Sequence, residues 1–303
     1  MSLSGSPHPP PLARGSIDRA AHERADPGLL RRLRDEATTR AIVVQGDRAR
    51  IDGRRSLLTV PVTEVPGDVE WAFLGRDEHG TALLVAAVPA AAEAPSTGGE
   101  WVSLRVAGGA LSAVDAGLFV EAVCLARWLG DAPFCPACGS RADLHAAGWS
   151  RRCAQCGREH FPRTDPAVIV AVVSPDDTRL LLGKNALWAD RNMFSTFAGF
   201  VEAGESLEAA IVREVHEEAG VRTRDLVYRG SQAWPYPRSL MLGFRATATD
   251  AAEARADGEE IVEVRWFERA ELAAALAGPA EFALPGATSI AHQLIVDWVE
   301  DAR

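Results

Sequence analysis

The sequence predicts an α+β protein in which a cysteine-rich module lies between two mixed domains. The first half alternates short apolar runs with Gly, Pro and Ser turn signals, which is typical of strands joined by loops. Two Cys-x-x-Cys pairs follow near the middle of the chain. The second half opens on the apolar, largely β-branched run 167–173, which indicates a buried strand, and it then contains an acidic amphipathic helix.

Changes in composition divide the chain into four expected segments. They are a flexible leader at 1–25, an N-terminal α+β domain at 26–130, a cysteine ribbon at 131–163 and a C-terminal domain at 164–303. The leader is rich in Ser and Pro and has no apolar period. A length of 303 residues is enough for two or three domains, each with its own core.

Both larger domains are predicted to mix strands and helices. In the N-terminal domain we predict strands at 41–44, 56–60, 69–74, 82–88 and 101–106, and helices at 28–37 and 115–129. In the C-terminal domain we predict strands at 167–173, 179–183, 226–231, 240–248 and 261–267, and helices at 206–219, 269–276 and 288–301.

The composition is normal for a globular protein, with 47% hydrophobic and 24% charged residues. The formal net charge of −10 argues against a general nucleic-acid binder, and it implies that a polyphosphate substrate needs a metal ion or a few placed arginines. No apolar run reaches the ~18 residues that cross a bilayer, so no membrane partner is expected. Because the N-terminus has no apolar signal core, we predict a cytoplasmic location.

Four of the five cysteines form a predicted zinc site. They are Cys135, Cys138, Cys153 and Cys156. Each Cys-x-x-Cys turn can direct two thiolates at one ion, and two such turns complete the tetrahedral four-sulfur shell that structural Zn²⁺ favours. A closed shell leaves no ligand position for substrate, which indicates a role in folding. Unpaired core cysteines or a redox pair are the alternatives, which the doubled motif disfavours, and Cys124 is expected to be a packing thiol.

The stretch 199–221 is predicted to form a loop and an acidic helix that begins after an N-cap at Ser206. Glu214, Glu217 and Glu218 are spaced i, i+3, i+4, so they share one helix face on which like charges repel. A divalent cation that prefers oxygen ligands would relieve that repulsion. A solvated acidic face is the alternative that this spacing alone leaves open.

The same stretch resembles the signature of the Nudix hydrolases. That signature is Gly, five residues, Glu, seven residues, Arg-Glu, an aliphatic residue, any residue, Glu-Glu, any residue, Gly and an aliphatic residue, and every fixed position is matched. The resemblance implies an α/β/α sandwich that uses Mg²⁺ or Mn²⁺ to hydrolyse a nucleoside diphosphate linked to another moiety. By this resemblance, Glu214, Glu217, Glu218 and the carbonyl of Ala198 would hold the metal ion, and Glu205 and Arg213 would support them.

A second segment is similar to a marker of the NADH pyrophosphatases within that family. Residues 231–239 read Ser-Gln-Ala-Trp-Pro-Tyr-Pro-Arg-Ser, where Ala233 stands in place of Pro and Tyr236 in place of Phe. By itself the segment would indicate a packed proline-aromatic turn. A four-cysteine ribbon directly before the Nudix domain is also typical of this subfamily, which further implies that the N-terminal domain is Nudix-like.

The resemblance also implies a set of substrate and metal contacts outside the helix. The predicted substrate-binding residues are Phe161, Phe200, Gln232, Trp234, Tyr236, Ser239 and Ala291. Glu260, chosen over Glu259 by its spacing to Trp266, would be a further carboxylate ligand of the metal ion.

The predicted reaction is metal-dependent hydrolysis of the pyrophosphate of NAD(H) to NMN(H) and AMP. RNA with a 5′ NAD cap carries the same bond and is the second candidate substrate. The arginines Arg151, Arg152, Arg158 and Arg163 surround the ribbon and would suit RNA, although a solvated ribbon surface is the simpler interpretation. Glu217 is a candidate acceptor of the water proton, and the resemblance implies a homodimer.

Two alternatives stay open at this point. One is a Nudix hydrolase of ADP-ribose, diadenosine polyphosphates or oxidised nucleotides, which the ribbon and the aromatic segment disfavour. The other is a non-catalytic nucleotide sensor or a zinc-ribbon regulator that binds nucleic acid. The intact signature disfavours this second alternative.

Overall fold

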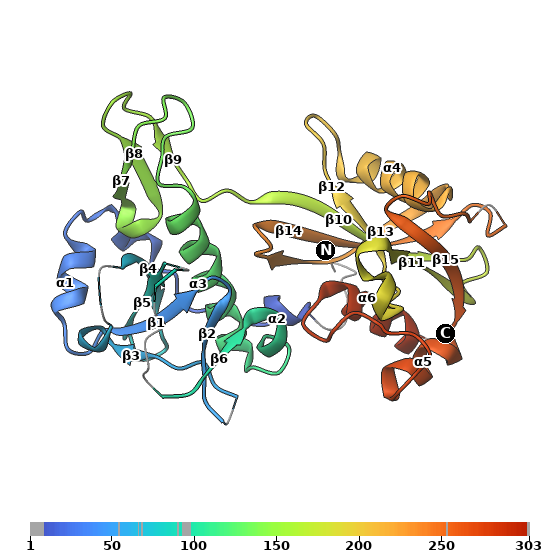
Figure 1. Cartoon of the computed structure of the whole chain (residues 1–303), viewed down its shortest axis with the longest axis horizontal. Helices are drawn as coiled ribbons and strands as arrows, with labels where there is room; N and C mark the ends of the chain where they lie inside the picture. The colour runs from blue at the N-terminus through green and yellow to red at the C-terminus, as the bar shows by residue number, and fades with distance from the viewer. Residues whose placement is uncertain are drawn as a thin grey trace. The chain divides into compact units, whose positions relative to one another are not determined.

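The computed structural model describes residues 9–53, 55–65, 67, 69–89, 91–92, 98–252 and 254–301. The chain divides into two compact units (Figure 1). The N-terminal unit comprises Leu12–Thr164 together with Pro235–Arg238, and the C-terminal unit comprises the stretch up to Pro11, Asp165–Trp234 and Ser239–Arg303. Among the described residues, no helix is both long and apolar enough to cross a bilayer.

A mixed six-stranded sheet forms the centre of the N-terminal unit. Its strands are β1 (Arg40–Gln45), β2 (Arg48–Ile51), β3 (Val60–Pro61), β4 (Glu70–Arg76), β5 (Ala82–Val88) and β6 (Glu100–Ser103). The order is β4-β5-β1-β2-β6, and β3 pairs with β1. Strands β1 and β5 run parallel, whereas the other pairs are antiparallel.

Helices α1 (Leu29–Asp35) and α3 (Ala113–Asp131) pack on this sheet, and the short α2 (Leu104–Ala107) follows β6. Leu29 of α1 joins Val43 and Phe73 of the sheet in one buried cluster. Helix α3 contacts β1, β4 and β5 and begins after Ser112, whose side chain accepts a hydrogen bond from the Asp115 amide at 3.0 Å. The apolar residues of both helices therefore complete the core of this unit.

The ribbon belongs to the N-terminal unit and is held there by polar contacts. Its strands β7 (Ala142–His145), β8 (Ser150–Cys153) and β9 (Glu159–His160) form an antiparallel sheet in that order. Arg151 is buried, and it donates to Glu70 at 2.6 Å and to the carbonyl of Leu129 at 2.7 Å. Trp149 donates its indole N–H to the carbonyl of Phe73 at 2.7 Å. Arg151 is thus a structural cation, and the suggested basic patch cannot include it.

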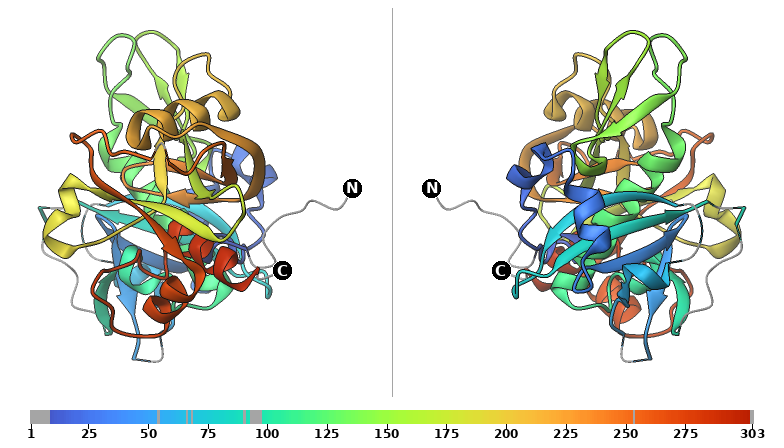
Figure 2. Two further views of the ribbon diagram at one scale, coloured as in Figure 1. Left: turned by 90° about the vertical axis from the view of Figure 1, so that its right-hand side faces the viewer. Right: turned by 90° about the vertical axis from the view of Figure 1, so that its left-hand side faces the viewer.

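The C-terminal unit is a second mixed sheet between helices (Figure 2). Its strands are β10 (Asp165–Val173), β11 (Arg179–Asn185), β12 (Phe197–Phe200), β13 (Thr223–Trp234), β14 (Ser239–Ala248) and β15 (Ile261–Glu268). The order is β13-β14-β10-β11-β15, and β12 pairs with β10. The helices are α4 (Leu207–Ala219), α5 (Arg269–Ala277) and α6 (Ile290–Glu300).

Alternation along β10 builds a core on each side of this sheet, because successive strand side chains point to opposite faces. Val170 lies in a buried cluster with Ile211 and Val215 of α4. Its neighbour Ile169 lies in a second cluster, which contains Leu294 of α6. The α/β/α sandwich that the resemblance implied is therefore confirmed.

The two sheets share one connectivity. Strands β1 to β6 and β10 to β15 are arranged in the same order, and in each sheet the first strand pairs in parallel with the fifth. The Nudix-like fold expected for the N-terminal domain is therefore confirmed. The sheets differ between their third and fourth strands, where the C-terminal unit contains α4 and the described part of the N-terminal connection contains only the short turn Val62–Glu64.

Several local predictions differ from the structure. Within the expected leader, residues 9–25 contain the turns Pro11–Ala13 and Ala21–Ala25, and Leu12 is buried, while residues 1–8 lie outside the described residues. The strand expected at 56–60 is reduced to β3, and the strand expected at 101–106 stops where α2 begins. Strands β2 and β12 were not predicted. Long-range contacts explain why residues 9–25 pack on the fold, since Arg14 donates hydrogen bonds to the carbonyls of Gly108 and Leu111.

Glu121 of α3 generates a prediction about stability. Burial raises the pKa of its carboxyl from an ordinary value of 4.5 to about 7, and Arg19 at 3.5 Å offsets part of this effect. The folded state therefore binds this proton more tightly than the unfolded chain, so stability falls as pH rises from about 4.5 through about 7. At pH 8 the free energy of unfolding of Glu121→Gln should exceed that of the parent by about 1 kcal/mol or more. Near pH 5 the two values should be equal. Thermal unfolding at both pH values measures this, and equal melting at pH 8 would contradict it.

Candidate functional site

Helix α4 begins and ends as its sequence predicts. The Ser206 hydroxyl accepts a hydrogen bond from the Ala209 amide at 3.2 Å, and Gly220 ends the helix at a φ of 67°. Before the helix, β12 brings Gly199 against the side chain of Glu214. A Cβ atom at position 199 would lie 1.9 Å from the carboxyl carbon of Glu214. Only glycine leaves room for that carboxylate.

Arg213 joins the loop to the helix through five hydrogen bonds. Its Nε and Nη2 donate to Glu205 at 2.9 and 2.8 Å, and Nη2 also donates to the carbonyl of Phe200 at 3.0 Å. Its Nη1 donates to Glu214 at 2.7 Å and to Glu217 at 3.3 Å. The Arg213 guanidinium, with the Glu202 amide, holds the pKa of Glu205 near 2. Glu205 therefore stays ionised and keeps this two-pronged pair at neutral pH.

Glu218 is the buried carboxylate of the group. It is 5% exposed, and burial raises its pKa to about 8, with further contributions from the charges of Glu260 and Glu214. Burial also raises the pKa of Glu214, while Arg213 opposes this shift. Glu260 lies directly before β15, where it accepts a hydrogen bond from Asn185 at 3.2 Å. Carboxylates from two separate segments therefore act on one another.

The donor atoms of this group fit a hard divalent cation, because Mg²⁺ and Mn²⁺ prefer carboxylate oxygens. The raised pKa values of Glu214 and Glu218 show that this site disfavours accumulated negative charge, which a cation would offset. Ala198 precedes Gly199 on β12, and it is Gly199 that lies against the Glu214 carboxylate. Within the described ranges, the four cysteines are the group whose ligand atoms all lie within 4.8 Å of one another, so the carboxylates are spread more widely.

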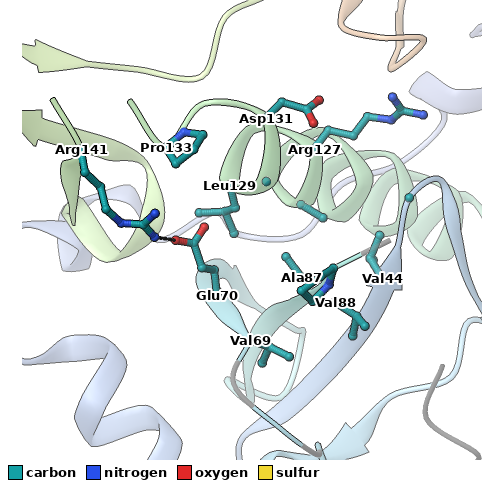
Figure 3. Close-up of a pocket in the computed structure, with 14 residues that line it drawn as sticks. Val44, Val69, Glu70, Ala87, Val88, Arg127, Leu129, Asp131, Pro133 and Arg141 are labelled. Carbon is teal, nitrogen blue, oxygen red and sulfur yellow. Dashed lines mark ion pairs between the residues drawn. The ribbon is translucent and has the colours of Figure 1, made fainter. Parts of the chain in front are cut away.

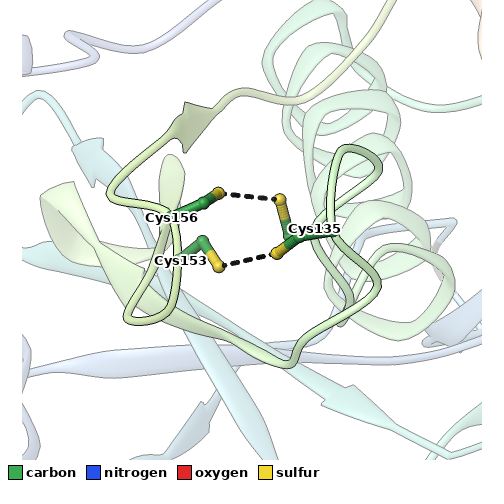
Figure 4. A group of neighbouring side chains, drawn as sticks. Cys135, Cys153 and Cys156 are labelled. Carbon is green, nitrogen blue, oxygen red and sulfur yellow. Dashed lines mark hydrogen bonds between the residues drawn. The ribbon is translucent and has the colours of Figure 1, made fainter.

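The cysteine ribbon gathers its four sulfurs as predicted (Figure 4). The Sγ atoms of Cys135 and Cys156 are 3.6 Å apart, and those of Cys138 and Cys153 are 3.4 Å apart. Four sulfurs around a tetrahedral Zn²⁺ at ~2.3 Å would be about 3.8 Å apart, so the cluster fits that ion. Cys124 lies outside this group, and burial raises the pKa of its thiol to about 11.

The predicted substrate residues are either exposed to solvent, buried in the core or paired between strands. Phe161 of the N-terminal unit and Phe200 of the C-terminal unit are exposed by 60% and 55%. Gln232 is buried and donates to the carbonyl of Thr288 at 3.1 Å, so its amide has a structural role. Two further predicted residues lie in the C-terminal unit. Ala291 is a buried residue of α6, and Ser239 pairs with Trp234 at the end of β13 and β14.

Tyr236, a predicted substrate-binding residue, has polar partners within the N-terminal unit. Residues Pro235–Arg238 belong to the N-terminal unit, where the Tyr236 hydroxyl donates to Asp47 at 3.0 Å and accepts from the Arg105 amide at 3.0 Å. The guanidinium carbon of Arg105 lies 4.2 Å from its ring centroid. Sequence spacing could not reveal this, because the partners are 131 and 189 residues away.

Two cavities of the N-terminal unit are relevant. One of about 600 Å³ is lined by Phe161, Phe134, Arg127 and Arg238, and so offers aromatic and cationic side chains together. The other, of about 780 Å³, lies beside the end of α3, where Arg141 and Glu70 form an ion pair at 3.8 Å (Figure 3). None of the predicted site residues lines this second cavity.

Sequence reasoning missed Asn185. This residue ends β11, its side chain donates to Glu260, and the carbonyl of Glu260 accepts from the next amide, that of Ala186, at 2.8 Å. Position 185 therefore places the carboxylate that comes from outside the helix. The sequence carries no local signal for this role, because the two residues are 75 positions apart.

The ribbon geometry predicts about one zinc ion per chain in protein purified without chelator. We expect Cys138→Ser to lose this zinc and to unfold several degrees lower, because a structural ion stabilises only the folded ribbon. Cys124→Ser is the matched control and should keep both properties. Elemental analysis and thermal unfolding measure the two effects, and a Cys138→Ser protein with full zinc content would refute the four-sulfur site.

Comparisons with known proteins agree with this geometry. A family model described as the NUDIX domain matches residues 163–284, and one described as the NADH pyrophosphatase zinc ribbon domain matches residues 131–161. A Mycobacterium tuberculosis protein named NAD-capped RNA hydrolase NudC is 39% identical, over 95% of this chain and 94% of that protein. The human NAD-capped RNA hydrolase NUDT12 is 36% identical, over 61% of this chain and 42% of that protein.

Among solved structures, a NUDIX hydrolase from Nitrosomonas europaea matches with 25% identity and a TM-score of 0.41, over 55% of this chain and 90% of that chain. The identity of 39% extends over nearly the whole chain, and the two family models match its ribbon and its sandwich. This chain belongs to the Nudix family, in the group that carries the NADH pyrophosphatase zinc ribbon.

Proposed function

We propose that this protein hydrolyses the pyrophosphate of NAD(H) to NMN(H) and AMP, and that it cleaves the same bond in NAD-capped RNA. The observation that carries the proposal is the group of carboxylates on α4 and at Glu260, organised by Arg213. The names of the similar mycobacterial and human proteins support this choice of substrate. A cytoplasmic location and a homodimer stay predictions.

The proposal assumes three domains, at 26–130, 131–163 and 164–303, and assigns the reaction to the third. The third domain would hold Mg²⁺ or Mn²⁺ through its carboxylates and one carbonyl, namely Glu214, Glu217, Glu218, Glu260 and the carbonyl of Ala198. Such an ion would neutralise charge on the pyrophosphate and lower the pKa of a water molecule. Glu205 and Arg213 act as positioning residues, since their pair joins the loop to the helix.

Glu217 is the proton acceptor in this mechanism. Its side chain is 60% exposed, so solvent and substrate reach it more easily than the buried Glu218. The oxygen of water bonds to one phosphorus, the P–O bond of the anhydride breaks, and the released proton passes to Glu217. Two phosphate monoesters result, which balances one water against one anhydride.

Exposed aromatic rings are suited to bind the bases. Phe161 and Phe200 each leave more than half of the side chain free to solvent, and flat rings stack on bases with little loss of conformational freedom. In this proposal substrate binding in the C-terminal unit also involves residues of β13, β14 and α6, namely Gln232, Trp234, Ser239 and Ala291.

The main test is product analysis after incubation with NADH, NAD⁺, ADP-ribose and NAD-capped RNA, each with Mn²⁺, Mg²⁺ or chelator. We expect NMN(H) and AMP from the dinucleotides, and no products with chelator. Glu218→Gln should lower turnover by about 10² or more, because it removes a charged ligand. Glu208→Gln, on the exposed first turn of the same helix, is the matched control and should keep wild-type turnover. Cleavage that persists in chelator would refute the metal mechanism, and cleavage of ADP-ribose alone would refute the substrate.

A second prediction concerns Gly199. The added methyl of Gly199→Ala would overlap the Glu214 carboxylate, so the variant should stay folded while losing about 10² in turnover. Gly278→Ala is the control, because its Cβ would meet nothing within 4 Å. Turnover and circular dichroism should be measured together. A folded Gly199→Ala protein with normal turnover would show that the position of Glu214 is unimportant.

A further inference from the structure

The tip of the β13–β14 hairpin crosses from one unit of the protein to the other. Trp234 and Ser239 pair at the end of the two strands in the C-terminal unit. The four residues between them, Pro235–Arg238, are packed in the N-terminal unit. The strands of this hairpin therefore belong to the unit that carries α4, and its tip belongs to the other unit.

Three hydrogen bonds close a ring around the Tyr236 hydroxyl. The hydroxyl donates to the carboxylate of Asp47 at 3.0 Å and accepts from the amide of Arg105 at 3.0 Å. The carbonyl of Asp47 accepts from the amide of Leu104, the residue before Arg105, at 2.9 Å. Asp47 follows β1 and Leu104 begins α2, so the ring ties the hairpin tip to two parts of the N-terminal fold.

Charge and burial reinforce this attachment. The guanidinium carbons of Arg105 and Arg127 lie 4.2 and 5.6 Å from the Tyr236 ring centroid, which is within the range of cation–π attraction. Burial and the nearby Asp47 carboxylate raise the pKa of Tyr236 to about 12. The phenol therefore keeps its proton and remains a donor to Asp47 throughout the neutral range.

The two residues that follow Tyr236 in the chain form part of a cavity wall. Pro237 and Arg238 line the cavity of about 600 Å³ that also contains Phe161 and Arg127. Since Tyr236 immediately precedes them, its attachment limits where they can lie. The hydroxyl that makes this attachment is the atom by which Tyr236 departs from the Phe of the subfamily marker.

We propose that Tyr236 is a positioning residue whose bonds to Asp47 and Arg105 set the cavity wall at Pro237 and Arg238, and with it the affinity for the base of a dinucleotide. The proposal rests on the proposed function for the identity of that ligand. It also assigns a role to the N-terminal domain, which holds the substrate loop although it carries no acidic helix among its described residues. Tyr236 itself does not stack on the base.

The attachment is tested first without substrate. Hydrogen exchange should show the Arg105 amide exchanging at least about tenfold faster in Tyr236→Phe, because its acceptor is removed. The Leu104 amide, bonded to the Asp47 carbonyl, is the internal reference and should change little. Tyr228→Phe changes the other tyrosine of the chain and is the matched control. Unchanged exchange at Arg105 would overturn the attachment.

The effect on substrate is tested by kinetics and by binding. Tyr236→Phe and Asp47→Ala should each raise the KM for NADH about fivefold with kcat unchanged, and the double variant should be no worse than either. Asp47→Asn retains an acceptor oxygen and should recover most of the loss. The Kd for NADH, measured in chelator so that turnover is blocked, should rank the variants in the same order as their KM values.

The outcomes separate this proposal from the proposed function. Wild-type protein that binds NADH in chelator but never cleaves it would refute the proposed activity alone. Wild-type KM and Kd values in Tyr236→Phe, together with faster Arg105 exchange, would overturn the positioning role. Absence of NADH binding by the wild-type protein would overturn both.

Discussion

The hydrogen bonds of the Arg213 guanidinium are the interactions on which the arrangement of the acidic helix and the loop before it depends. The guanidinium binds Glu205 with two hydrogen bonds and reaches Glu214, Glu217 and the carbonyl of Phe200 with the rest. The loop between β12 and α4 turns back over the start of the helix and lacks the regular hydrogen bonds of a helix or sheet. The guanidinium of Arg213, with its five N–H donors, supplies hydrogen bonds that hold this loop. Gly199 completes the arrangement by leaving room for the Glu214 carboxylate.

The chain carries one sheet connectivity twice, and among the described residues the acidic helix belongs to the C-terminal copy. The C-terminal sheet has α4 between its third and fourth strands, and with it the carboxylates. The N-terminal sheet instead carries the ribbon, which the buried Arg151 fixes to Glu70 and to the end of α3. Within the N-terminal unit Asp47 and Arg105 hold the tip of the β13–β14 hairpin.

The cysteine ribbon and the carboxylate group on α4 differ in their physical requirements. In the ribbon, two tight turns bring four sulfurs close together, and a closed shell stabilises a segment with little core of its own. On α4, burial and neighbouring charges disfavour ionisation of Glu218, and a cation is the means of keeping such a group charged at neutral pH.

Local patterns determined much of this protein. The spacing of Glu214, Glu217 and Glu218 is set by the helix period, the cysteine turns are set by adjacent residues, and the strands of both sheets follow their apolar runs. Tertiary structure decided what depends on distant partners: the support of Glu260 by Asn185, the burial of Arg151 and the capture of Tyr236 by the N-terminal fold. Period and propensity act over a few residues, whereas these contacts join positions from 22 to 189 apart, which only packing brings together.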